Sequence, residues 1–324
     1  FFKIANVIPF EKAVEEMKKA ILKSYGKKGE DIVNMNYAAV DAGGNAVVKV
    51  EVPAEWANIV VKEEEEHTAD AARPDFVKKI VDPINALKGD LLPVSAFNGR
   101  EDGTWDNGTA AYEKRGIAVD VPEWKIGNCI QCNQCAYVCP HAVIRPFLAT
   151  EEEAAASGVE WKQGLGETKE YKFRIQISPM DCTGCSNCVD VCPAKDKALV
   201  MRPLEEQMPQ QKNWDYITKN IGYKQVVDKT KSVKNLQFAQ PLFEFSGACA
   251  GCGETPYIKA ISQLFGDKMM VANATGCTSI YSGSAPSTPY CTNAAGQGPA
   301  WANSLFEDNA EFGLGMHVGV EKLR

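Results

Sequence analysis

The clearest hydrophobic pattern lies near the beginning of the chain. Between Phe10 and Tyr25, apolar residues recur every three or four positions, and lysines occupy the opposite face. Pro9 precedes this stretch and Gly26 follows it, as helix start and stop signals do. The pattern therefore predicts an amphipathic helix over residues 10–25. Further on, the valine-rich run Val47–Val52 predicts a short strand.

A later region, from Pro93 to Pro122, has no such periodicity. Turn pairs such as Asn98-Gly99 and Asn107-Gly108 dominate it. It is therefore expected to be a small module of hairpins and loops.

The last part of the chain has an α/β rhythm. Thr255-Pro256 can open a helix that Gly266 closes, and Met269–Ala272 follows as a buried strand. Cofactors in open α/β sheets lie beyond the carboxyl ends of the strands, and Cys277 would stand there. The apolar stripe of the expected helix consists of Ile258, Ile261 and Leu264.

The composition is that of an ordinary globular protein. The chain has 324 residues, 45% of them hydrophobic and 24% charged, and this length suits two or three domains. A net charge of −7 argues against nucleic acid as the main partner, because binding phosphates needs an excess of lysine and arginine. The acidic run Glu63–Glu66 is most simply a solvated surface or a linker. No run of about 18 apolar residues predicts a membrane span.

The chain starts at Phe1 with neither an initiator methionine nor a signal-peptide pattern. We therefore expect either a processed protein or a piece of a longer one.

Eight of the 12 cysteines form two identical arrays. Both read C-x2-C-x2-C-x3-C-P, the bacterial run that binds two [4Fe–4S] clusters, in which the fourth cysteine of each array ligates the other cluster. One predicted ligand set is Cys129, Cys132, Cys135 and Cys192. The other predicted set is Cys182, Cys185, Cys188 and Cys139.

The spacing has a physical reason. Three thiolates two residues apart can surround one corner of a cubane while backbone N–H groups point at its sulfurs. The crossed fourth ligand brings the two cubanes close together, which electron hopping needs. The repeat also implies internal pseudo-symmetry, interrupted by an insertion at Glu151–Tyr171. The sequence thus predicts an electron path between Cys129 and Cys192.

Zinc and disulfides fit these eight cysteines less well than clusters do. Structural zinc takes four ligands in tetrahedral pairs, which two complete four-cysteine runs fit poorly. Disulfide scaffolds are usually short secreted chains. Metal-bound thiolates instead indicate a reducing cytoplasm.

A third cysteine group consists of Cys249, Cys252 and Cys277. The first two form a C-x2-C pair in a glycine-rich stretch, which lets the backbone approach a cofactor. Alone, such a pair is compatible with zinc, a redox-active dithiol or a third cluster. A fourth ligand is needed, and Cys291 is the spare cysteine, but it also fits the role of a small buried residue. The three histidines form no metal-ligand spacing and are expected to be structural or exposed: His67, His141 and His317.

Four stretches together resemble the single-chain type of pyruvate:ferredoxin (flavodoxin) oxidoreductase, of which this chain would be an internal segment. Residues 10–41 resemble the end of that family's gamma-type domain. Gly99–Thr104 and Tyr112–Gly116 resemble a small module named for its Glu-Lys-Arg triplet. The two arrays match the ferredoxin-like domain. The stretches that resemble the start of the thiamine diphosphate domain are Gly247–Tyr257, Ala274–Ser279 and Gly298–Asp308.

The resemblance implies an α/β multidomain segment. A ferredoxin-like α+β domain with two [4Fe–4S] clusters would lie between the end of an α/β domain and the start of a thiamine-diphosphate-binding α/β domain. The implied domains are residues 1–67 (gamma-type), 68–117 (Glu-Lys-Arg module), 118–222 (ferredoxin-like) and 223–324 (thiamine diphosphate, truncated).

The resemblance also implies roles for the third group. Cys249, Cys252 and Cys277 match three ligands of a third [4Fe–4S] cluster, whose fourth ligand would lie outside this chain. Glu254 and Cys277 match positions that lie against thiamine diphosphate. The Gly-Asp-Gly motif that would anchor the diphosphate and Mg²⁺ is not in the chain. No catalytic residue is expected in this segment.

The implied activity of the parent protein is the oxidation of pyruvate with coenzyme A to acetyl-CoA and CO₂. Electrons would leave singly through the clusters to a ferredoxin or flavodoxin, in a cell with anaerobic metabolism, and a homodimer is implied. Two alternatives stay open. One is a stand-alone two-cluster electron-transfer module, and the other is a sister enzyme acting on another 2-oxoacid.

Overall fold

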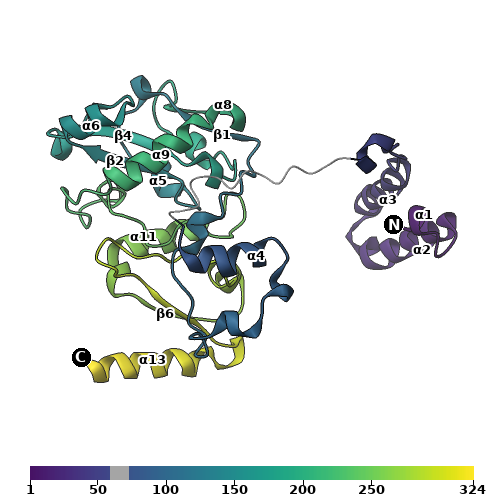
Figure 1. Ribbon diagram of the computed structural model, residues 1–324. Coiled ribbons are helices and arrows are strands. Elements are labelled where there is room, and N and C mark those ends of the chain that lie inside the picture. The colour runs from purple at the N-terminus through teal and green to yellow at the C-terminus, as the bar shows by residue number, and fades with distance from the viewer. Residues whose placement is uncertain (59–72) are drawn as a thin grey trace. The chain divides into compact units, whose positions relative to one another are not determined.

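The computed structural model describes residues 1–58 and 73–324, and the chain forms two compact units, Phe1–His67 and Thr68–Arg324 (Figure 1). The acidic run Glu63–Glu66, His67 and the predicted domain boundary after residue 67 lie outside the described residues. Within the described ranges, no helix combines the length and the apolar character that crossing a bilayer requires.

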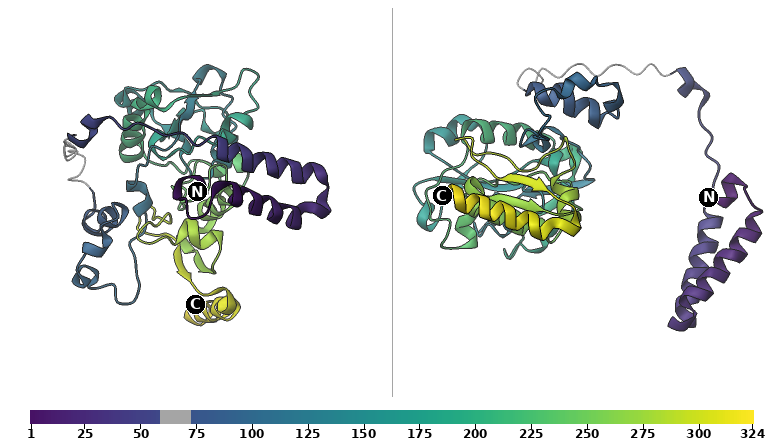
Figure 2. Two further views of the ribbon diagram at one scale, coloured as in Figure 1. Left: turned by 90° about the vertical axis from the view of Figure 1, so that its right-hand side faces the viewer. Right: turned by 90° about the horizontal axis from the view of Figure 1, so that it is seen from below.

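The first unit is built on two antiparallel helices, α2 (Phe10–Tyr25) and α3 (Glu30–Asn45). The short helix α1 (Phe2–Ala5) precedes them. α2 and α3 lie side by side (Figure 2), and Lys18 pairs with Asp41 across them at 2.7 Å. The predicted helix over residues 10–25 is confirmed with the same bounds.

The strand predicted at Val47–Val52 is wrong. This segment has no regular secondary structure, and Val48 and Val50 are each 75% exposed. A strand is stable only when a neighbouring strand takes up its backbone hydrogen bonds. No strand is present among the described residues of this unit.

The second unit begins with short helical turns. A π-helix at Val77–Val81 continues into α4 (Asp82–Asn85), and 3₁₀ turns follow at Gly89–Leu91, Val94–Phe97 and Thr109–Tyr112. The loops predicted between Pro93 and Pro122 are therefore present. The hairpins predicted there are wrong, because no two strands of this region pair with each other, and the glycine turns connect 3₁₀ turns and irregular loops.

Two similar halves follow, each with a cysteine array between two strands. The first half is β1 (Asp120–Trp124), α5 (Gln134–Val138) and β2 (Ile144–Ala149). The second is β4 (Lys172–Ile177), α7 (Asn187–Asp190) and β5 (Leu199–Pro203). β1 pairs with β5 and β2 pairs with β4, both antiparallel, so each sheet takes one strand from each half. This arrangement is the internal pseudo-symmetry that the repeated array predicts.

The segment between the halves is an insertion at the edge of one sheet. It contains α6 (Glu151–Ser157) and β3 (Lys162–Gln163), and β3 pairs with β4. α6 starts with a capping box, in which Thr150 accepts from the Glu153 backbone N–H and Glu153 accepts from that of Thr150.

The core lies between these sheets and the helices after β5. These helices are α8 (Leu204–Gln207) and α9 (Pro209–Asn220), and α9 buries Trp214 and Ile217 over the β2–β4 sheet. Every residue of β2 is buried as a result. Among the side chains that are almost completely buried are Phe147, Phe173, Ile144 and Ile175.

The last region contains α10 (Val233–Leu236), α11 (Thr255–Phe265), β6 (Met270–Asn273), α12 (Cys277–Ser282), β7 (Ala300–Asn303) and α13 (Asn309–Leu323). β6 and β7 are parallel, and α13 lies along them (Figure 2, right). The helix and strand predicted after Thr255 are confirmed. The strand is less buried than predicted, because Met270 is 52% exposed.

A buried arginine joins the ferredoxin-type halves to the C-terminal region. Arg145 on β2 is 5% exposed, and its guanidinium pairs with Glu244 and donates to the Tyr223 hydroxyl. The guanidinium carbon lies 4.9 Å from the ring centroid of Trp214. A buried charge of this kind is tolerated only with its partners in place.

We predict that Arg145→Met destabilises the protein by about 3–5 kcal/mol, because it leaves unpaired the Glu244 carboxylate, whose side chain is only 13% exposed. Arg202→Met is the matched control, since Arg202 pairs with Glu123 on the surface at 3.3 Å and should cost at most about 1 kcal/mol. Anaerobic urea unfolding followed by circular dichroism measures both. Equal losses of unfolding free energy in the two variants would contradict a stabilising role of the Arg145–Glu244 ion pair.

Candidate functional site

The two arrays share an unusual backbone. Gln131 and Asn133 in the first array have φ values of 58° and 60°, and Gly184 and Ser186 hold the equivalent positions of the second with 68° and 65°. Residues other than glycine seldom adopt this left-handed conformation. Its recurrence at the same two places in each array curls the chain so that the first three cysteines face one centre.

Backbone N–H groups point at the cysteine sulfurs in both arrays. Gln131 N–H donates to Cys129 Sγ and Gly184 N–H to Cys182 Sγ, each at 3.4 Å. Ala198 N–H lies 3.3 Å from the sulfur of Cys192, the fourth cysteine of the second array. Such donors stabilise thiolate charge.

Two cavities of similar size are lined by thiols, and each takes its fourth cysteine from the other array. The free space within them, including the part open to solvent, is about 340 and 360 Å³. The first is lined by Cys129, Cys132, Cys135 and Cys192, together with Trp124, Ile130, Ile175 and Leu199. The second is lined by Cys139, Cys182, Cys185 and Cys188, together with Pro122, Val143, Ile144 and Met201. The crossed spacing predicts the same two sets of four as cluster ligands, and their ligation stays a prediction.

The surroundings of the thiols are largely apolar. Burial raises the pKa of Cys182 to about 12, and it also raises the pKa values of Cys135 and Cys188, with neighbouring cysteines adding to the shift. Cys135 of the first cavity is one of the groups that raise the pKa of Cys188 in the second, so the two cavities lie close together. Thiols in such a site need a strong positive charge to ionise, and bound iron supplies one.

The donor set fits iron–sulfur clusters better than a single metal ion. Thiolates around one zinc ion lie about 3.8 Å apart, given Zn–S bonds of about 2.3 Å. In the described residues, no three His, Cys, Asp or Glu side chains come close enough to hold one ion. Two wider cavities with four thiols each and N–H donors at the sulfurs match the ligation of [4Fe–4S] clusters.

The loop that carries Cys249 and Cys252 lies against the second array. A Cβ atom on Gly251, between Cys249 and Cys252, would be 3.6 Å from Cys185 Cβ. Cys277 starts α12 directly beyond the end of the parallel strand β6, where the sequence predicts it, and it is exposed. Neither thiol-lined cavity includes Cys249, Cys252 or Cys277.

Glu254 and Cys291 differ in their surroundings. Glu254 is exposed at the start of α11. Burial is the largest cause of the raised pKa of Tyr281, and Glu254 raises that pKa further. Cys291 is buried, with its sulfur 3.5 Å from the Pro241 carbonyl oxygen, and burial raises its pKa. Cys291 lines neither thiol cavity and is consistent with a small buried residue.

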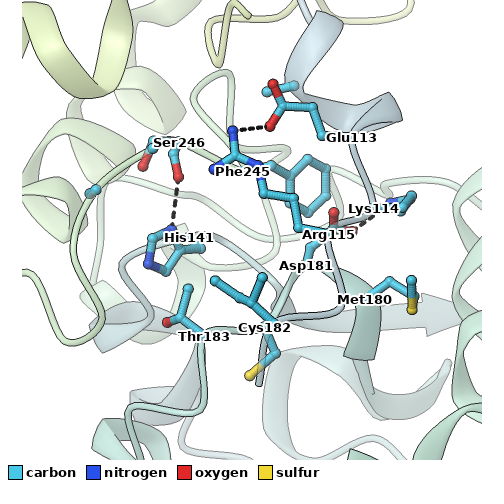
Figure 3. Close-up of a pocket in the computed structure, with 14 residues that line it drawn as sticks. Glu113, Lys114, Arg115, His141, Met180, Asp181, Cys182, Thr183, Phe245 and Ser246 are labelled. Carbon is cyan, nitrogen blue, oxygen red and sulfur yellow. Dashed lines mark hydrogen bonds and ion pairs between the residues drawn. The ribbon is translucent and has the colours of Figure 1, made fainter. Parts of the chain in front are cut away.

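The Glu-Lys-Arg triplet lines a pocket against the second array (Figure 3). The Lys114 ammonium pairs with the buried carboxylate of Asp181, which directly precedes Cys182, and Arg115 pairs with Glu113. Burial raises the pKa of Asp181, and Lys114 acts against that shift. The triplet therefore holds the turn that leads into the second array.

His141 forms another wall of this pocket. Its Nδ1 lies 3.1 Å from the Ser246 carbonyl oxygen and must carry the proton, since a carbonyl only accepts. Burial lowers the pKa of His141, which favours the neutral form of the ring. His141 is thus a buried link between the first array and the loop before Cys249, whereas His317 is exposed on α13.

Three side chains that support the arrays have no signal in the sequence pattern. Gln131 Nε2 donates to the Gln163 carbonyl at 2.7 Å, and Lys162 Nζ donates to the Cys129 carbonyl at 2.7 Å. Lys259 Nζ donates to the Tyr137 carbonyl at 3.0 Å, and burial lowers its pKa to about 8. Their partners are remote in sequence, so only the folded chain reveals these contacts.

The fold and the cavities define a ferredoxin-type protein with two iron–sulfur sites. In agreement, residues 128–195 match the 4Fe-4S dicluster domain. Residues 62–118, which include the Glu-Lys-Arg triplet, match EKR, a domain of unknown function.

The whole chain is similar to pyruvate:ferredoxin and pyruvate-flavodoxin oxidoreductases, which confirms the resemblance seen in the sequence. It is 54% identical to the pyruvate-flavodoxin oxidoreductase of Enterobacter agglomerans over 100% of this chain and 27% of that protein. It is 55% identical to the pyruvate:ferredoxin oxidoreductase of Moorella thermoacetica over 99% of this chain and 27% of that protein. A third relative is the mitochondrial pyruvate dehydrogenase [NADP(+)] of Euglena gracilis, 48% identical over 100% of this chain and 18% of that protein. The chain thus spans about a quarter of the length of the first two relatives.

We predict that Cys192→Ser changes the same cluster as Cys132→Ser, because both thiols line the first cavity. Cys139→Ser should likewise change the same cluster as Cys185→Ser, because both thiols line the second cavity. The EPR spectra of the reduced, iron-loaded variants measure this. If Cys192→Ser instead matches Cys185→Ser, each array holds its own cluster and the crossed assignment is wrong.

Proposed function

We propose that this chain carries electrons through two [4Fe–4S] clusters as part of a pyruvate:ferredoxin or pyruvate-flavodoxin oxidoreductase. The observation that carries this proposal is the pair of neighbouring cavities, each lined by four thiols in a crossed arrangement. The matched dicluster domain and the names of the relatives support it.

The residues have distinct tasks in this proposal. The four cysteines of each cavity hold one cluster, and the bound clusters would supply one-electron chemistry at potentials between about −700 and +450 mV. Apolar walls, such as Ile175 with Leu199 and Val143 with Ile144, keep water away from the sulfurs. The N–H groups of Gln131 and Gly184 stabilise the thiolates.

The third group supplies the proposed entry point for electrons. Cys249, Cys252 and Cys277 would provide three ligands of a third [4Fe–4S] cluster. Gly251 packs on Cys185, so this loop lies nearest to the second cavity. Electrons that enter here would reach the second cavity first and the first cavity next.

The proposed overall reaction removes two electrons from pyruvate. Pyruvate and coenzyme A give acetyl-CoA, CO₂ and a proton, and the two electrons leave singly to a ferredoxin or flavodoxin. Glu254 and Cys277 are the residues of this chain proposed to lie against thiamine diphosphate. Because the chain has no Gly-Asp-Gly motif for the diphosphate and Mg²⁺, no step through that cofactor is assigned to these residues.

We also propose a cytoplasmic location for this protein. It suits the twelve cysteines, which form no disulfide among the described residues. The homodimer stays a prediction from the resemblance. The sister 2-oxoacid enzyme and the stand-alone electron-transfer module stay the alternative functions, and no contact in the described residues favours either one.

We predict that the chain, reconstituted anaerobically, binds about eight irons with matching acid-labile sulfide, as two clusters of four. Cys132→Ala and Cys185→Ala should each lower the content by about four irons. Cys291→Ala is the matched control, because Cys291 is a buried cysteine outside both cavities, and it should leave the content unchanged.

Different iron contents would have definite meanings. About twelve irons would mean that a third cluster forms on the Cys249 loop without a ligand from elsewhere in the protein. Zinc, or no metal in a folded chain, would refute the proposed function.

A further inference from the structure

Helix α11 buries its polar face. The predicted apolar stripe is partly open to solvent, with Ile261 45% exposed, and the neighbouring Phe265 is 61% exposed. The buried residues of this helix are instead mostly polar: Thr255, Pro256, Lys259, Ser262 and Gln263. Buried polar side chains are stable where they find hydrogen-bond partners, and Lys259, Ser262 and Gln263 each donate to a backbone carbonyl.

Lys259, 2% exposed, meets the helix that separates the two cluster sites. Its Nζ donates to the carbonyl oxygens of Ala136 and Tyr137 on α5, the second at 3.0 Å. α5 contains Cys135, which lines the first cavity, and it is followed by Cys139, which lines the second. The ammonium therefore lies beside both proposed clusters.

This ammonium has no acidic partner among the described residues. The ion pairs formed by the described residues do not include Lys259. The thiols of Cys139 and Cys135, one from each cavity, favour its charged form, and the Arg145 guanidinium opposes it. A buried charge is costly unless an opposite charge compensates it, and thiolate-ligated clusters are anionic.

Capping of α5 alone does not require this charge. Gln263, one turn further along the same buried face, donates to the Leu236 and Ala239 carbonyls with a neutral amide. A neutral side chain can thus serve backbone carbonyls on this face. The charge at Lys259 therefore has a role beyond donating these hydrogen bonds.

We propose that Lys259 is an electrostatic positioning residue that raises the reduction potentials of the two clusters held by the arrays. The inference rests on the proposed function. Each cluster gains one electron and no proton or bond change, so its reduced form carries one more negative charge. A fixed positive charge beside both sites stabilises that reduced form.

The test is an anaerobic potentiometric titration of the iron-loaded chain, with the reduced clusters followed by EPR. Lys259→Met should lower the equilibrium constant for reduction about tenfold, which is about 59 mV for a one-electron couple. Lys259→Arg keeps the charge and should restore most of that shift. Lys229→Met is the matched control, because Lys229 also donates to a backbone carbonyl, that of Gln263 on α11 at 2.7 Å, but not to α5, which contains Cys135 of the first cavity and is followed by Cys139 of the second.

Each outcome decides the proposal. Loaded Lys259→Met with an unchanged potential, or the same shift in Lys229→Met, would overturn it. If Lys259→Met loses its iron, retention of iron by Lys259→Arg supports the compensating charge, and loss in both variants overturns it. A wild-type chain that takes up no iron would instead refute the proposed function.

Discussion

The exchange of one cysteine between the two arrays is the constraint on which the rest of this structure depends. Neither array lines a cavity with its own four thiols, because each cavity takes one thiol from the other half. The backbone makes the same exchange, since β1 pairs with β5 and β2 with β4. Thiol pairing and strand pairing therefore favour the same single arrangement of the two halves.

Charged side chains surround the thiol sites without lining their apolar walls. Lys114 pairs with Asp181 beside the second array, and Arg145 on β2 pairs with Glu244. Lys259 reaches α5 from the C-terminal region, and Lys162 reaches the Cys129 carbonyl from the insertion. Because these contacts come from segments remote in sequence, they tie the array loops to the surrounding domain.

The sequence predicts the parts of this structure that depend on local spacing. The helix over residues 10–25, the helix after Thr255 and the composition of both thiol sets follow from residue periodicity and motif. Val47–Val52 has the local character of a strand but finds no partner strand among the described residues. The buried polar face of α11 runs against the periodicity of its apolar residues, because Lys259 and Gln263 are buried by contacts that only the tertiary structure provides.

The crossed arrangement also bears on how such a protein would acquire its clusters. A ribosome releases the chain from the N-terminus, so the first array emerges with only three of the thiols that line its cavity. Cys139 lines the second cavity, whose set of four thiols is complete once Cys188 has emerged. The first cavity has its four thiols only once Cys192 has emerged. Both sites therefore become complete within a few residues of synthesis. Under the proposed ligation, neither site has its four thiols until the second array has been synthesised, so loading one array after the other is not possible.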